Sequence, residues 1–97
     1  MRESEIEAAF KKMVEEKDGL YYKFTSPSRV GVPDRLVLFD VDLWFFVEFK
    51  SEEGHLEPWQ DREIRRLRDR GVKVFVVNDM EGVWYIGRWV DYHRSEK

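Results

Sequence analysis

The chain has 97 residues, of which 42% are hydrophobic and 15% aromatic, so it can bury the core of one ordinary domain. It has no cysteine and no apolar run near the roughly 20 residues of a membrane span, which excludes a disulfide framework, a thiolate metal site and a spanning helix. The net charge of −3 gives no general argument for binding nucleic acid, and we expect a single cytoplasmic domain over residues 1–97 without a secretion leader.

The first half of the chain predicts one helix followed by three strands. Residues 3–17 form the helix, which an Asp-Gly pair ends. Its apolar side chains recur at the helical period: Ile6, Phe10, Met13 and Val14. A short strand over 20–24 and a loop of turn-forming residues over 25–33 come next. Strands over 34–40 and 43–50 follow, joined by a tight turn.

The second half predicts a helix and a strand. The helix begins at Pro58, runs to about Arg70 and closes at Gly71. Residues 72–77 are apolar and β-branched, which is typical of a strand. From Asn78 onward apolar residues suggest a last helix, but two glycines weaken it. The predicted order, α-β-β-β-α-β with a last helix left open, is that of an α/β domain with a small sheet between helices.

Charged side chains interrupt the most apolar strand at its end. Alternate residues of a strand share a face, so Glu48 and Lys50 project from the same side as Trp44 and Phe46. The opposite side carries only apolar residues: Leu43, Phe45, Val47 and Phe49. Both faces are apolar over most of the strand, which predicts a central strand covered on both sides.

The hairpin brings a second carboxylate to this point. A turn centred on Val41, with Asp40 facing Asp42, would place Asp34 directly across from Glu48. Opposed side chains have Cβ atoms about 5 Å apart, and two carboxylates at that separation repel unless one is protonated or a cation lies between them. A hard divalent ion such as Mg²⁺ or Mn²⁺ suits oxygen ligands of this kind. The alternative is an ion pair of Glu with Lys, or of Asp with Arg, at the sheet edge.

One polar residue of the second predicted helix belongs with this group. Gln60 shares a helix face with Ile64 and Leu67, so it lies in the middle of an apolar stripe. A buried polar group needs partners, which predicts that Gln60 points toward the charged end of the sheet. The alternative is that it satisfies only local backbone groups.

These motifs together resemble a known family. The stretches SPSRVGVPDRLVL and FFVEFK and the following Gln60 are similar to the VRR-NUC (virus-type replication-repair nuclease) family of the PD-(D/E)xK superfamily, over most of the chain. The resemblance implies a restriction-endonuclease-like core with a mixed central sheet flanked by helices. It also implies a phage or bacterial origin, with a phage protein acting in the host cytoplasm.

The resemblance assigns roles to individual residues. Asp34 and Glu48 would be ligands of Mg²⁺ or Mn²⁺, with the backbone carbonyl of Phe49 as a further ligand. Lys50 would be the catalytic lysine and Gln60 the polar residue that a helix adds to the site. The family also carries an acid on its first helix, for which three residues are candidates: Glu3, Glu5 and Glu7. We choose Glu7 as a catalytic residue and metal ligand, although the alternative for each acid is stabilisation of the helix N-terminus.

Other residues near the motifs suggest contacts with DNA and with a second chain. Four side chains flank the site and are candidates to hold phosphates, with an ordinary surface residue as the favoured alternative for each: Lys23, Ser26, Arg29 and Arg35. An excess of aromatic residues, including Trp59, Trp84, Trp89 and Tyr92, indicates either an interface or a filled core.

The resemblance implies a metal-dependent endonuclease that hydrolyses phosphodiester bonds in branched DNA, such as Holliday junctions, during DNA repair. A homodimer suits a four-way junction because two active sites must cut symmetrically. Two alternatives remain: a restriction-like endonuclease acting on duplex DNA, and a non-catalytic module of the same fold that binds DNA or protein. We expect no interaction with a membrane.

Overall fold

The computed structural model describes residues 1–95, and the last two residues of the predicted domain lie outside them. The elements are α1 (Glu3–Glu16), β1 (Leu20–Lys23), β2 (Arg35–Asp40), β3 (Leu43–Phe49), α2 (Pro58–Asp69), β4 (Val74–Val77) and α3 (Met80–Ser95). This order confirms the predicted α/β class and adds α3, which the sequence left open.

The four strands form one mixed sheet in the order β1-β2-β3-β4. β1, β2 and β3 are antiparallel neighbours, and β4 runs parallel to β3, as the chain can do after crossing over through α2. β3 therefore has a neighbour on each side, which confirms its predicted central place and fixes the charged end of the strand in the middle of the sheet.

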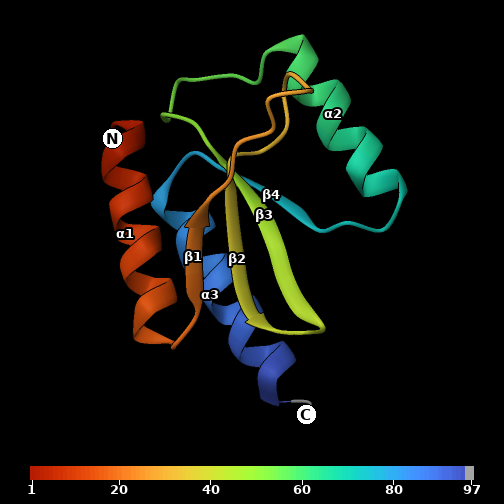
Figure 1. Ribbon diagram of the computed structural model, residues 1–97. Coiled ribbons are helices and arrows are strands. Elements are labelled where there is room, and N and C mark those ends of the chain that lie inside the picture. The colour runs from red at the N-terminus through yellow and green to blue at the C-terminus, as the bar shows by residue number, and fades with distance from the viewer. Residues whose placement is uncertain (96–97) are drawn as a thin grey trace.

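α1 and α3 cover one face of this sheet, whereas α2 stands apart from them and contacts β4 (Figure 1). α1 buries Ile6, Phe10 and Val14 completely, the residues that its helical period predicts. Phe10 meets Phe49 of β3 edge to face, with ring centroids 5.3 Å apart. Within residues 1–95 no helix is long and apolar enough to cross a membrane.

The glycines of the last segment mark contacts rather than a break in α3. The N–H group of Gly82 donates a hydrogen bond to Oδ1 of Asp79 (2.9 Å), which caps the helix start. Gly87 is buried against α1, where an added Cβ would lie 3.6 Å from the Met13 side chain. The contact of Gly82 is thus a local cap, whereas Gly87 meets a residue far away in the sequence, which a local pattern cannot show.

The hairpin between β2 and β3 has the predicted register but a different turn. Asp40 pairs with Leu43 rather than with Asp42, and Phe39 is the extra residue of a β-bulge. The bulge shifts the pairing by one, so Leu38 lies opposite Trp44 and Arg35 opposite Val47. The predicted turn is wrong, yet the pairing beyond the bulge is the one predicted.

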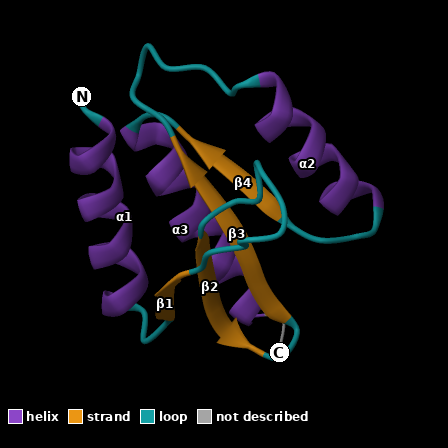
Figure 2. Ribbon diagram, turned by 45° about the horizontal axis from the view of Figure 1, so that its top comes forward, coloured by secondary structure: helices purple, strands orange, loops and turns teal. Residues whose placement is uncertain are grey.

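The second face of β3 is covered only at one end, contrary to prediction. Trp44 is 40% exposed, whereas Glu48 is 9% exposed. The loop between β1 and β2 crosses in front of β3 in Figure 2 and packs against the first turn of α2, whose Gln60 donates a hydrogen bond to Glu48. The sheet is therefore buried on one face throughout and on the other only where the charged residues lie.

Candidate active site

The predicted carboxylate pair lies on the partly covered face of the sheet. Arg35 pairs with Val47, so the preceding Asp34 comes beside Glu48, and the Asp34 charge acts on Glu48. The two side chains differ in their surroundings: that of Asp34 is 60% exposed and that of Glu48 only 11%. One carboxylate is thus fixed inside the fold, and the other lies beside it with most of its surface in solvent.

Gln60 and Lys50 are the polar neighbours of Glu48. The Gln60 Nε2 group donates a hydrogen bond to Glu48 Oε2 at 3.2 Å. Its other end, Oε1, accepts the backbone N–H of Glu57 at 2.9 Å, which sets the amide so that the donor faces the carboxylate. Lys50 Nζ lies 4.0 Å from the same Oε2 atom and is 18% exposed. The structure therefore brings together Asp34, Glu48, Lys50 and Gln60.

The surroundings of Glu48 favour its neutral form in the protein alone. Burial raises the pKa of Glu48, the negative charge of Asp34 raises it further and Lys50 opposes the change, leaving that pKa at about 7. A buried carboxylate with so little compensating charge is a place where a cation would be stabilised.

The backbone at Phe49 offers a further oxygen. The N–H groups of Phe46 and Lys50 both bond to carbonyls on the β4 side, so the backbone groups of Phe49 turn toward β2. In the β2–β3 register Phe49 comes opposite Pro33. Proline has no N–H group, so the ladder supplies no donor to the Phe49 carbonyl at this position.

Glu7 lies away from this group, on the helix-covered face. Its carboxylate accepts hydrogen bonds from the Arg35 guanidinium and the Tyr21 hydroxyl. Burial acts to raise the pKa of Glu7, but the bonds from Arg35 and Tyr21 outweigh it and hold that pKa below its usual value. Arg35 faces the same side of the sheet as Val47, opposite to Asp34 and Glu48. The sheet therefore separates Glu7 from the carboxylate pair.

Glu3, another acid of α1, influences the pKa of Glu48. Among the acids of α1, the negative charge of Glu3 contributes to the raised pKa of Glu48. Glu3 is exposed in the first turn, beyond the end of β3, whereas the predicted Glu7 lies one turn further along α1. Glu5 accepts a hydrogen bond from the Arg2 backbone and belongs to the start of the helix. Helical spacing from the apolar stripe could have favoured Glu3.

The residues predicted to hold phosphates have different surroundings. Lys23 is exposed at the end of β1, and Ser26 lies half-buried in the following loop. Arg29 pairs with the buried Glu63 through its Nε atom at 2.8 Å. Arg35 is only 12% exposed and bridges Glu7 and Asp34, with its NH1 2.9 Å from Asp34 Oδ1. Arg35 thus ties the two faces of the sheet together.

The remaining donors limit what the site can hold. Among residues 1–95 no group of three or more His, Cys, Asp or Glu side chains is placed to hold a metal ion. Two carboxylates and a carbonyl are left, a ligand set that suits Mg²⁺, since this ion keeps several waters and takes few protein carboxylates. The donors fit such an ion by chemistry.

Known proteins resemble this chain in both sequence and fold. The family model of the VRR-NUC domain matches residues 1–80. A phage protein described as "Putative nuclease p44", from Acyrthosiphon pisum secondary endosymbiont phage 1, is 40% identical over 81 residues, which are 84% of this chain and 87% of that protein. A solved structure described as a VRR_NUC domain has a TM-score of 0.79 and 35% identity, and the match covers 87% of this chain and 91% of that one.

Proposed function

This chain belongs to the VRR-NUC family of nucleases, and from that premise we propose that it is a divalent-metal-dependent endonuclease that hydrolyses phosphodiester bonds in branched DNA. The observation that supports the proposal most is the buried Glu48, which lies beside Asp34 and Lys50 and is held by Gln60. If Glu48 served only in a structural ion pair, its burial would gain little, because Lys50 lies 4.0 Å away and does not offset the loss of hydration.

The proposed ligands of the ion are Asp34, Glu48 and the Phe49 carbonyl, with Mg²⁺ or Mn²⁺ as the metal. When bound, such an ion supplies positive charge that eases loss of a proton from water and neutralises charge on the scissile phosphate. Glu7 is occupied by Arg35 and Tyr21, so we assign it the role of holding Arg35 rather than that of a ligand.

The side chains of the protein have separate tasks in this reaction. The water oxygen forms a bond to phosphorus, the bond to the leaving oxygen breaks, and that oxygen takes up a proton. Lys50 projects on the same face as Glu48, so its ammonium group can orient the water or stabilise negative charge on the phosphate. Gln60 holds Glu48 in one orientation, because its amide is fixed at both ends.

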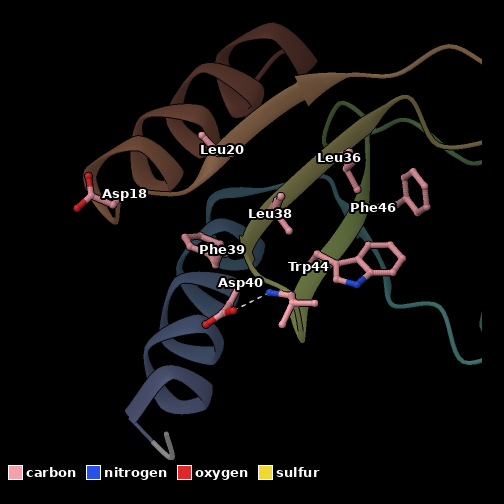
Figure 3. Close-up of a pocket in the computed structure, with 9 residues that line it drawn as sticks. Asp18, Leu20, Leu36, Leu38, Phe39, Asp40, Trp44 and Phe46 are labelled. Carbon is pink, nitrogen blue, oxygen red and sulfur yellow. Dashed lines mark hydrogen bonds between the residues drawn. The ribbon is translucent and has the colours of Figure 1, made fainter.

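Branched DNA and a homodimer form the finer part of the proposal. The partly covered face of the sheet carries two apolar cross-strand rows, Leu20-Leu38-Trp44 and Tyr22-Leu36-Phe46, which lead to the row that contains Asp34 and Glu48. Five residues of these rows line a hollow of about 860 Å³ (Figure 3): Leu20, Leu36, Leu38, Trp44 and Phe46. A second copy packed on this face would bring two active sites to the edges of one interface, as symmetric cutting of a junction requires.

The exposed area of this face suits such an interface. Leu20 and Tyr22 are each 49% exposed, Phe24 is 38% and Trp44 is 40% exposed. Because large aromatic side chains have roughly 150–250 Å² of surface each, these residues supply on the order of half of the ~800 Å² that one partner buries in a standard interface. The polar rim would supply the rest.

A substrate panel tests the proposal. Purified protein is incubated with a four-way junction, a flap and a linear duplex of the same sequence, with Mg²⁺, with Mn²⁺ and with chelator. We expect cleavage of the branched DNAs only when metal is present. Equal cleavage of linear duplex would support the restriction-like alternative, and binding without cleavage under every condition would support the non-catalytic module.

A further inference from the structure

A charged groove lies beside the active site, between α2 and the loop that joins β1 to β2. It has a volume of about 490 Å³ and is lined chiefly by Arg29, Trp59, Arg62, Glu63 and Arg66. Three positive charges here oppose one negative charge, in a chain whose net charge is −3. The groove is therefore a local basic site on an acidic protein, as an anionic ligand would require.

Glu63 organises the arginines of this groove. Its side chain is 7% exposed, accepts a hydrogen bond from Arg29 Nε at 2.8 Å and forms an ion pair with Arg66 Nε at 3.4 Å. A guanidinium group carries further N–H donors on its two terminal nitrogens, and these suit the oxygens of a phosphate. Arg62 is exposed and makes no ion pair within the part of the chain that the structure describes. The groove thus offers two oriented guanidinium groups and one unpaired cation.

An aromatic ring completes the groove. Trp59 is 45% exposed although it stands in the first turn of α2. Its backbone is fixed, because Gly31 of the facing loop packs so closely that an added Cβ would lie 2.5 Å from the Trp59 carbonyl oxygen. Exposed aromatic rings beside arginines are the combination that binds single-stranded nucleic acid, since a base can stack on the ring while the cations hold the backbone.

We propose that this groove binds an unpaired or unstacked stretch of DNA beside the cleavage site, with a base on Trp59 and phosphates on Arg62 and Arg66. The proposal rests on the proposed nuclease function for its substrate. An intact duplex keeps its bases stacked inside and offers nothing to Trp59, whereas a branch point exposes nucleotides that can unstack. Preference for branched DNA would then arise in part from this groove.

The groove is coupled to the active site through α2. Trp59 is adjacent to Gln60, whose amide bonds to Glu48. Arg62 and Arg66 follow on the next two turns of the same helix, so they lie within about 10 Å of Trp59 along the helix axis. A strand held in the groove would therefore approach Glu48 and Lys50 from the α2 side.

Binding without metal tests the groove separately from catalysis. Fluorescein-labelled single strand, fork and blunt duplex are titrated in chelator by anisotropy at several salt concentrations. We expect Arg62→Ala with Arg66→Ala to weaken single-strand and fork binding about tenfold or more and to lower the salt slope by roughly 1.4, about 0.7 for each lost phosphate contact. Trp59→Ala should weaken the same two ligands about tenfold and leave blunt duplex unchanged.

The matched control removes the same amount of charge from α2 and its C-cap residue. Arg65→Ala with Arg70→Ala lies outside the groove, where Arg65 pairs with Asp61 at 3.0 Å, and should stay within about twofold of wild type. Equal loss of affinity in both double variants would contradict the proposal. So would a loss of duplex affinity in Trp59→Ala as large as its loss of single-strand affinity. If the Arg62/Arg66 double variant is unfolded by circular dichroism, Arg62→Ala alone must show about half of the change in slope.

The outcomes separate the two proposals. Wild-type protein that binds single strand through the groove but cleaves none of the DNAs with metal would contradict the nuclease proposal and leave the groove standing. Wild-type protein that cleaves while the two double variants bind alike would contradict the groove alone.

Discussion

Glu48 is the residue where stability and function oppose each other. It is buried on an apolar strand, and its neighbours are an amide and a lysine 4.0 Å away. Such a partner set does not repay the loss of hydration of a charged carboxylate, so its pKa rises to about 7. Burial of the Glu48 carboxylate therefore lowers the stability of the metal-free protein, and a bound cation would offset this loss.

Stability of the metal-free protein should fall as pH rises from about 4.5 to about 7. Over this range the folded state keeps a proton on Glu48 that the unfolded chain has released. The resulting loss in the free energy of unfolding is therefore complete above pH 7. Glu48→Gln should therefore be more stable than wild type by about 1–3 kcal/mol at pH 8, with the difference vanishing near pH 4.5. Urea unfolding in chelator measures this, with Glu53→Gln as the surface control. Parallel pH profiles for wild type and Glu48→Gln would contradict the assignment.

At the scale of elements, the contact between α2 and the β1–β2 loop positions the site. α2 carries Gln60 to Glu48, and the loop meets the helix backbone at Trp59. Gly31 permits the approach in two ways, because it has φ +88° and because it lacks a Cβ. The loop thus acts as a fixed support for the first turn of α2.

Substituting two glycines separates these two contributions. Gly31→Ala and Gly71→Ala both place a side chain at positive φ (+88° and +85°), which costs about 1–2 kcal/mol. Only Gly31→Ala also meets helix backbone, since nothing lies within 4 Å of a Cβ at Gly71. We expect Gly31→Ala to lose a further 1–3 kcal/mol or so in urea unfolding, and to lower cleavage. Equal losses in the two variants would mean that the loop does not rest on α2.

How far the sequence predicts these elements depends on whether the determining contact is local. Strand alternation and the hairpin register predicted the carboxylate pair, and the helix period predicted the direction of Gln60. The bulge at Phe39 and the continuation of α3 through Gly87 depend on contacts with other elements, so a local pattern could not supply them. The pairing of Glu7 with Arg35 likewise depends on which face of the sheet α1 covers.

At the scale of the whole molecule, the two faces of the sheet serve different purposes. α1 and α3 close one face over an apolar core, whereas the other face leaves apolar strands open up to the carboxylate row. Exposed apolar surface of this extent on a small protein is typical of an interface. The aromatic residues accordingly divide, since Trp89 packs against Phe45 and Phe75 while Trp44 remains half-exposed.

Two tryptophan substitutions test whether this face joins two copies. Trp44→Glu places a charge on the open sheet face and should convert a dimer into a monomer at micromolar concentration. Trp84→Glu is the matched control, because Trp84 is 57% exposed on α3, away from the open face, and should leave the dimer intact. Light scattering measures the mass of each. A monomeric wild type, or equal dissociation of both variants, would contradict a dimer through the sheet.

The central claim is that hydrolysis takes place at the end of β3. The most direct measurement compares junction cleavage by wild type, Asp34→Ala and Lys50→Ala with Mg²⁺, each purified identically and shown to be folded. Removal of a ligand or of the transition-state cation should lower the rate about 10²-fold or more, while urea midpoints stay near that of wild type because Asp34 and Lys50 lie outside the apolar core. Undiminished cleavage by both variants would contradict the account.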